Sequence, residues 1–258
     1  MKYETILYEI DDKVARITIN QAEKMNRLSN IVLREIVHAA RSADTDDNVK
    51  VLIISGAGEK AFCAGADLKG LEHESVLKSS ENLKDYAELC LTFNTLKTPS
   101  IAMIRGYALA GGCGLAMLPT FSIASENAKF GTPEINVGMW PMMVMAILFR
   151  TVGKKKGLEL ICTGDMINAH EAERIGMITK VVPDQQLENE VAELANKLKN
   201  KSGSILGLGL EAFQKTTDME YIKAISYLRN MAAILTSAPD SIEGARAFAE
   251  KRKPKWST

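Results

Sequence analysis

An α/β fold that ends in a run of helices is the architecture this sequence predicts, and three observations support it. Short apolar runs typical of strands alternate with segments of helical spacing up to about residue 187. Beyond that residue helical spacing continues without another strand-like run. The chain has 258 residues, 46% of them hydrophobic, which is enough to bury about three quarters of its unfolded surface.

The first predicted elements are a strand, a helix and a second strand. Residues 14–20 alternate between apolar and polar side chains, as in a strand with one buried face. Apolar residues then recur at helical spacing over 33–40, and a short apolar run at 49–54 ends at a Ser-Gly pair. This order is typical of the start of an α/β domain.

The later elements continue the alternation and then become helical. Pro183 ends the last predicted strand because proline cannot donate to a strand ladder. The later strands are predicted at 101–104, 121–124 and 177–182, with helices at 156–162 and 170–175. The amphipathic helices after them are predicted at 187–198, 205–213, 221–235 and 241–252.

Two segments rich in glycine and alanine are the strongest functional signal. Residues 61–68 (AFCAGADL) let the backbone approach a ligand at little steric cost. Residues 104–117 (IRGYALAGGCGLAM) continue an apolar strand into a small-residue turn and a buried helix, whose first N–H groups have no partner within the helix. Both segments can aim backbone donors at one acceptor, as in an oxyanion hole.

Net charge and the length of the apolar runs indicate neither a nucleic-acid nor a membrane partner. The 32 basic and 32 acidic residues cancel, and no apolar run reaches the roughly 20 residues that span a bilayer. The first residues lack the pattern of a targeting segment, so we expect a cytoplasmic protein.

The cysteines predict reduced thiols and no metal site, because they are widely spaced without a nearby histidine. They are Cys63, Cys90, Cys113 and Cys162.

Six motifs in order make the chain resemble the crotonase (enoyl-CoA hydratase/isomerase) superfamily. They are the two segments above together with 20–29 (NQAEKMNRLS), 126–138 (ENAKFGTPEINVG), 163–179 (TGDMINAHEAERIGMIT) and 247–256 (AFAEKRKPKW). The resemblance implies a crotonase-like spiral of ββα units with an acyl-CoA site in residues 1–195, and a helical trimerisation region in 196–258. It implies an acyl-CoA substrate, no cofactor beyond the coenzyme A of that substrate, and a homotrimer or a dimer of trimers.

The same resemblance assigns three catalytic residues. The N–H groups of Ala64 and Gly111 are expected to grip the thioester oxygen and stabilise an enolate. Glu134 matches the glutamate of the family motif F-G-x-P-E, read here as FGTPE at 130–134. A carboxylate beside such an enolate can shuttle a proton if desolvation raises its pKa toward neutrality.

Substrate contacts can be carried over by the same matches. Lys24, Met25 and Leu28 belong to a nucleotide-facing turn, although Gln21 and Ala22 replace the usual Arg-Pro. Phe248 and Lys251 match tail residues that contact coenzyme A in relatives, and the alternative interpretation is that they belong to a basic, solvated C-terminal helix. The expected binding residues are Lys24, Met25, Leu28, Ala64, Gly65, Ala66, Asp67, Leu68, Gly111, Gly114, Trp140, Phe248 and Lys251.

The polar stretch at 69–84 has no clean periodicity and is predicted to be a mobile loop. Because this stretch borders the acyl pocket in the family, Glu72, His73 and Glu74 are candidate auxiliary acid/base groups. The alternative is a solvated loop without a catalytic role.

Two departures from the family pattern affect the reaction. Hydratases of the family carry a second glutamate in G-G-C-E, and this chain has Gly114 at that position. The glycine-rich stretch that usually follows the Pro-Glu motif is replaced by residues 140–145 (WPMMVM), which either wall an acyl pocket or form the core of a helix.

We therefore expect an acyl-CoA enzyme with one general acid/base, Glu134. Its reaction is predicted to be double-bond isomerisation, or hydration with a substitute for the second glutamate. Decarboxylation or hydrolysis of an acyl-CoA is the chemical alternative because the same oxyanion hole serves any enolate. An inactive acyl-CoA-binding subunit is the alternative of a different class.

Overall fold

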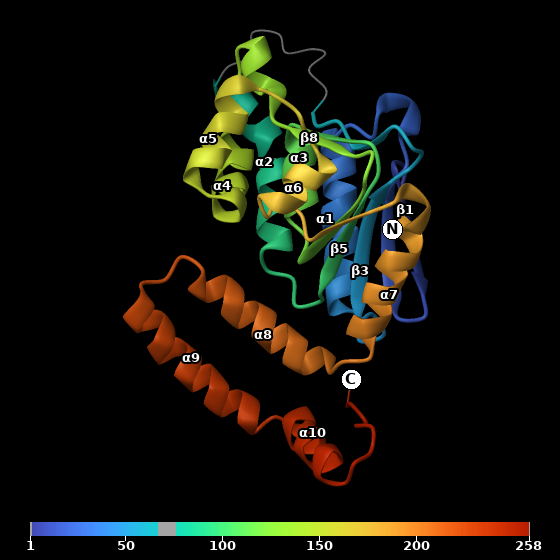
Figure 1. The fold of residues 1–258 in the computed structure, drawn as a ribbon, viewed down its shortest axis with the longest axis vertical. Coiled ribbons are helices and arrows are strands. Elements are labelled where there is room, and N and C mark those ends of the chain that lie inside the picture. The colour runs from blue at the N-terminus through green and yellow to red at the C-terminus, as the bar shows by residue number, and fades with distance from the viewer. Residues whose placement is uncertain (1, 67–75, 258) are drawn as a thin grey trace.

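The computed structural model describes residues 2–66 and 76–257 and has the expected α/β architecture (Figure 1). Its strands are β1 (Ile6–Asp11), β2 (Val14–Ile19), β3 (Val51–Gly56), β4 (Ala61–Cys63), β5 (Ser100–Ile104), β6 (Tyr107–Leu109), β7 (Phe121–Ser125), β8 (Lys129–Gly131), β9 (Ile167–Asn168) and β10 (Lys180–Val182).

The helices confirm every helical segment predicted above. They are α1 (Asn30–Thr45), α2 (Val76–Phe93), α3 (Gly111–Met117), α4 (Met142–Val152), α5 (Lys154–Thr163), α6 (Ala169–Arg174), α7 (Leu187–Lys199), α8 (Gly203–Thr216), α9 (Tyr221–Thr236) and α10 (Pro239–Ala249). Short 3-10 turns are η1 (Ala22–Lys24), η2 (Pro133–Val137) and η3 (Asp184–Gln186). Within the described residues, no helix combines the length and apolarity that a membrane span requires.

Two sheets are built by successive pairs of strands. The larger sheet has the order β1-β2-β3-β5-β7-β10, and the smaller has the order β4-β6-β8-β9. Strands β3, β5 and β7 are parallel neighbours in the first sheet, and β4, β6 and β8 are parallel neighbours in the second. The pairs β3/β4, β5/β6 and β7/β8 therefore each add one strand to each sheet before a helix, which confirms the spiral of ββα units.

The larger sheet is covered on both faces, because alternate residues of its strands point to opposite sides. Leu52 and Ile54 of β3 share a core with α1, whereas Val51 and Ile53 pack in a second cluster with Leu187 and other residues of α7. Near-continuous apolar strands are typical of a parallel sheet buried on both faces.

The predicted loop at 69–84 was wrong for its second half, because residues 76–84 are the first turns of α2. Val76 and Leu77 are almost fully exposed there, so apolar side chains do not mark one buried face. Only the C-terminal half of α2 has that face, formed by Tyr86, Leu89 and Phe93. Strand β10 is shorter than predicted, because the amides of Met177 and Ile178 donate back to the Ala172 carbonyl oxygen after the turn at Gly176, and the chain first bonds to β7 at Thr179.

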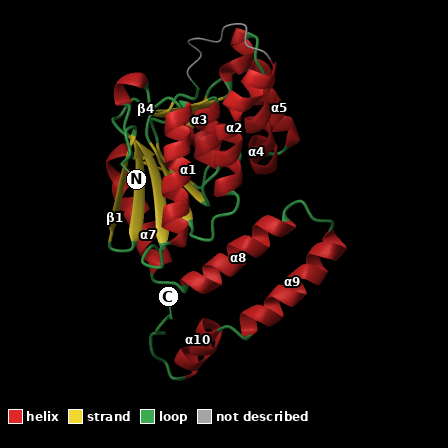
Figure 2. Cartoon of the chain, turned by 180° about the vertical axis from the view of Figure 1, so that it is seen from behind, coloured by secondary structure: helices red, strands yellow, loops and turns green. Residues whose placement is uncertain are grey.

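Helices α8, α9 and α10 extend away from the two sheets, as Figures 1 and 2 show from opposite sides. The expected division after residue 195 lies inside α7, which continues to Lys199. These three helices carry large apolar side chains that are one third to nine tenths exposed: Phe213, Tyr221, Ile222, Ile225, Leu228, Ile234, Ile242 and Phe248.

Candidate active site

The two glycine-alanine segments meet in the fold. A Cβ added to Gly65 would lie 2.8 Å from the Ala110 Cβ and 3.1 Å from the Gly111 nitrogen. A Cβ added to Gly112 would lie 2.1 Å from the Cys63 carbonyl oxygen. Neither position has room for a side chain, so glycine is what allows the two backbones to come together.

The amide of Ala64 is not the free donor that the sequence predicted. Its N–H donates to the Met25 carbonyl oxygen at 3.0 Å, and the next amide, of Gly65, donates to the Cys63 sulfur. The Ala66 amide has no hydrogen bond to a described residue, although Leu28 pairs with Ala66 in an isolated bridge. Among these three amides, only that of Ala66 is without a partner among the described residues.

The amide of Gly111 lies at the start of α3, as predicted. The preceding Ala110 has a positive φ of 53°, which turns the chain from β6 into the helix. Helical bonds begin with the amides of Cys113 and Gly114, both of which donate to the Ala110 carbonyl oxygen, while the Gly111 N–H has no partner among the described residues. It is therefore available to a ligand.

Glu134 lies in η2, directly after β8 and Pro133. Its side chain is half-buried, and the Oε2 atom is fully buried without a hydrogen-bond partner in the described structure. Burial raises the pKa of Glu134 above its ordinary value, and a hydrogen bond from its own backbone amide opposes the increase. A buried carboxyl oxygen without a partner is costly in a folded protein unless a ligand or water completes it.

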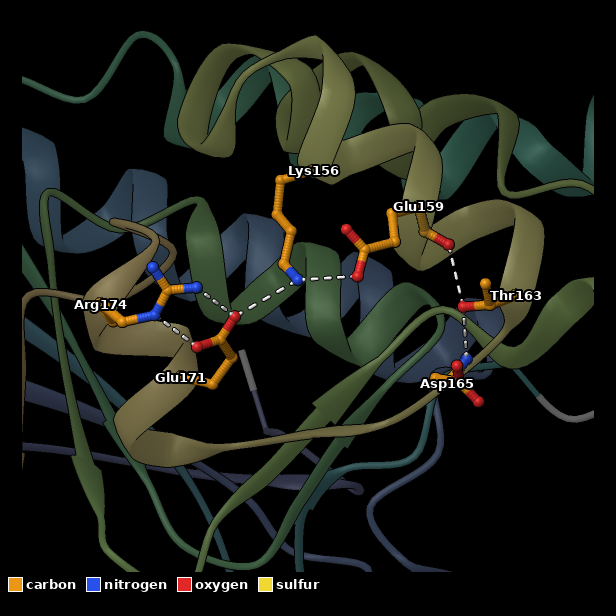
Figure 3. Close-up of polar contacts among 6 residues, drawn as sticks. All are labelled: Lys156, Glu159, Thr163, Asp165, Glu171 and Arg174. Atoms are coloured by element: carbon orange, nitrogen blue, oxygen red, sulfur yellow. Dashed lines mark hydrogen bonds and ion pairs between the residues drawn. The ribbon is translucent and has the colours of Figure 1, made fainter.

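Helix α5 and the turn after it support η2 from behind. Gly164 has a φ of 67°, and a Cβ there would lie 2.8 Å from both Asn136 Nδ2 and Ile135 Cγ2 of η2. An ion network fixes α5 against α6, in which Lys156 contacts both Glu159 (2.9 Å) and Glu171 (3.3 Å) (Figure 3).

Tyr86 is a site residue that sequence reasoning missed. Its hydroxyl donates to the Gly111 carbonyl oxygen at 2.9 Å, and a Cβ added to Gly114 would lie 2.2 Å from that hydroxyl. Burial raises the pKa of Tyr86 well above its ordinary value, and the charge of Glu134 contributes in the same direction. The spacing of Tyr86, Leu89 and Phe93 could have placed the tyrosine on a buried helix face, but nothing in the sequence connects it with Gly114.

Asn26 is a second residue that was missed. It is fully buried, and its side-chain amide donates to the carbonyl oxygens of Ala57 (3.0 Å) and Ala61 (2.7 Å). Both Met25 and Asn26 have positive φ angles, which asparagine tolerates better than most residues. Asn26 thus holds the turn that presents the Met25 carbonyl to Ala64.

The remaining predicted binding residues divide into three groups. Leu28 is buried next to Gly111, whereas Lys24 is exposed at the end of η1. Phe248 of α10 and Lys251, two residues after that helix, are exposed, and Figure 1 shows α10 far from α3, the helix that begins at Gly111. Asp67 and Leu68, with the candidate acid/base residues Glu72, His73 and Glu74, lie outside the described residues.

Residues 140–145 lead into and begin α4. The Trp140 indole N–H donates to the Met145 sulfur at 3.3 Å, and both side chains pack partly against the core with Met143. Met142 is 67% exposed, while Val144 is buried and faces Gly114. Helix-core packing therefore accounts for Met143 and Met145.

Residues 2–66 and 76–257 contain no cluster of three or more His, Cys, Asp or Glu side chains that could hold a metal ion.

Comparison with known proteins agrees with this fold. The family model described as Enoyl-CoA hydratase/isomerase matches residues 9–258. A probable enoyl-CoA hydratase, echA8, of Mycobacterium bovis is 37% identical over 257 residues, which is 99% of each chain. A crotonyl-CoA hydratase of Syntrophomonas wolfei is 36% identical over 254 residues, which is 98% of each chain.

Solved structures with a similar fold also include an enoyl-CoA hydratase. An enoyl-CoA hydratase of Mycobacterium smegmatis has a TM-score of 0.94 at 29% identity, with 99% of this chain and 100% of that chain covered. Human enoyl coenzyme A hydratase domain-containing protein 3 has a TM-score of 0.94 at 30% identity, with 98% and 100% covered. The fold is that of a crotonase-type enzyme, and the chain belongs to the enoyl-CoA hydratase/isomerase family.

Proposed function

We propose that this enzyme adds water to short 2-enoyl-CoA thioesters. The amides of Ala66 and Gly111 hold the thioester oxygen, and Glu134 moves the proton. The observation that carries the proposal is the convergence of two segments that hold unpaired amides, together with a buried Glu134 oxygen that also lacks a partner in the described structure. The names of the relatives, which include a crotonyl-CoA hydratase, support hydration of a short chain.

The reaction balances with one carboxylate. Glu134 accepts a proton from water as the water oxygen bonds to C3 of the enoyl group, and the π electrons move to the thioester oxygen. The two amides stabilise the resulting enolate. Glu134 then returns the proton to C2, so that a 3-hydroxyacyl thioester forms and the carboxylate is restored. No cofactor is needed beyond the coenzyme A that the substrate carries.

Double-bond isomerisation is the second candidate, and Gly114 is the observation that favours it. The glutamate with which hydratases of this family help to hold water is absent there. An isomerase needs only to remove a proton at one carbon and return it at another, which Glu134 alone can do. Decarboxylation or hydrolysis would use the same amides.

The coenzyme A portion is proposed to lie along Lys24 and Met25 and to reach Phe248 and Lys251 of a second copy of the chain. This contact requires a trimer, or a dimer of trimers. Its support is the exposure of Phe248, which is 88%, and of the apolar faces of α8 to α10.

Glu134→Gln tests the proposal. The variant keeps the shape of the side chain but cannot take a proton, so hydration of crotonyl-CoA should fall by about 100- to 10,000-fold. Binding of the substrate should persist, as measured by calorimetry. Glu126→Gln, at an exposed glutamate just after β7, is the control and should keep full activity. Wild-type turnover of a 3-enoyl-CoA without hydration of crotonyl-CoA would support isomerisation, and unchanged hydration by Glu134→Gln would refute the role of Glu134.

A further inference from the structure

The space beside Gly114 is already filled by a polar group from another element. The Tyr86 hydroxyl, from the middle of α2, would lie 2.2 Å from a Cβ on Gly114, and the Val144 side chain closes the other side at 3.2 Å. A side chain at position 114 would start in the volume that this hydroxyl occupies. The polar group beside position 114 is therefore the Tyr86 hydroxyl of α2, and not a side chain of α3.

The hydroxyl also lies next to the proposed oxyanion donor. It bonds to the carbonyl oxygen of Gly111, the residue whose amide is the proposed oxyanion donor. A Cβ on Gly111 would lie 3.2 Å from the Tyr86 ring, so the ring lies against that residue. The charge of Glu134 acts on Tyr86 and on Cys113 of α3.

We propose that Tyr86 replaces the missing second glutamate and holds the attacking water together with Glu134. The inference rests on the proposed hydratase function. A phenol has one proton and two lone pairs, and the Tyr86 proton is directed to the Gly111 carbonyl. No described residue donates a hydrogen bond to this hydroxyl, so its lone pairs can accept one from water. The water then gives its second proton to Glu134 as its oxygen attacks C3.

Tyr86 holds the water but does not take its proton. Burial keeps the phenol neutral by raising its pKa well above the ordinary value. The proton therefore goes to Glu134, and the site works with one acid/base group and one neutral acceptor. This differs from a site with two carboxylates, in which either carboxylate can accept a proton.

Tyr86→Phe separates water-holding from a structural role, because it keeps the ring and removes the hydroxyl. Two reactions are measured: hydration of crotonyl-CoA, and exchange of the α-proton of butyryl-CoA with deuterium oxide. Exchange needs Glu134 and the two amides but adds no water. Hydration should fall about tenfold or more, the kinetic equivalent of one hydrogen bond, whereas exchange should stay within about twofold.

The control is Tyr8→Phe, at a half-buried tyrosine of β1 whose pKa is also raised by burial, and both of its rates should be unchanged. Equal loss of both rates in Tyr86→Phe would show that the hydroxyl only supports α3 and would overturn the proposal. Unchanged hydration would also overturn it. A wild-type protein that exchanges butyryl-CoA but does not hydrate crotonyl-CoA would instead reject the hydratase function, and with it this role.

Discussion

Three consecutive amides, of Ala64, Gly65 and Ala66, have three different fates in this site. The first bonds to the Met25 carbonyl, the second to the Cys63 sulfur, and the third has no partner in the described structure. Composition alone could not distinguish them, because all three residues are small. The left-handed turn at Met25 and Asn26 decides the outcome, since it presents the carbonyl that engages Ala64.

The pH dependence of turnover should report the buried environment of Glu134. Burial raises its pKa, and the reaction needs the ionised form, so kcat/KM should decline as the pH falls through a value above the ordinary 4.5 of a glutamate. The measurement is a pH–rate profile for crotonyl-CoA, with enzyme stability checked at each pH. An acidic limb at or below the ordinary glutamate value would contradict a desolvated base.

Gly114→Glu should not simply create a two-carboxylate hydratase. Its Cβ would meet the Tyr86 hydroxyl at 2.2 Å, so the single variant must displace Tyr86. Overpacking of this kind typically costs about 1–3 kcal/mol. We expect a lower melting temperature and slower hydration of crotonyl-CoA. The double variant Gly114→Glu/Tyr86→Ala removes the obstacle and should recover part of both, and failure to recover either would contradict this account.

At the scale of elements, the position of Glu134 depends on what supports the turn that carries it. The 3-10 turn η2 rests on the end of α5, where Gly164 packs against Asn136 and Ile135. The charged side chains in Figure 3 join α5 to α6, because the Glu171 carboxylate of α6 pairs with Lys156 of α5 and with Arg174. Contacts from residues about thirty positions later in the chain therefore support the turn that carries the Glu134 carboxyl.

Gly164→Ala should lower turnover through this support. The substitution places a Cβ 2.8 Å from η2 and forces alanine into a positive φ, which costs about 1–3 kcal/mol. We expect kcat for crotonyl-CoA to fall severalfold with the melting temperature. Gly176→Ala is the matched control, because its φ is 77° and its nearest neighbour, the Thr151 oxygen, is 3.9 Å away. The control should be destabilised but keep its kcat, and equal loss of kcat in both variants would refute the positioning role.

At the scale of the whole molecule, the C-terminal helices look incomplete in a single chain. Helices α8 to α10 project from the sheets and expose large apolar side chains, among them Phe213 and Phe248 (Figure 2). An apolar surface of this extent is typical of an interface between subunits. In Figures 1 and 2 these helices also lie away from α3, the helix that begins at Gly111, which agrees with the proposed coenzyme A contact from a neighbouring chain.

We predict a trimer or a dimer of trimers in sedimentation velocity at micromolar concentration. Phe213→Glu places a charge on the exposed face of α8 and should dissociate the assembly and weaken binding of acyl-CoA. Leu91→Glu changes an apolar residue of similar exposure on α2, 61% against 68%, and should leave the assembly intact. A wild-type monomer at these concentrations would refute the prediction.

Local patterns alone determined the alternation of strands and helices, the two glycine-alanine segments and the motif that contains Glu134. Strand and helix periodicity is a property of neighbouring residues, and glycine at a close approach is a local steric requirement. Periodicity did not predict the first turns of α2, because their apolar residues are exposed to solvent. The tertiary structure alone decided that, among the described residues, Ala64 has a partner for its amide and Ala66 has none, and that Tyr86 lies beside Gly114. Those outcomes depend on contacts between segments 25 to 39 residues apart, such as the bonds from Tyr86 to Gly111 and from Ala64 to Met25, which no local pattern encodes.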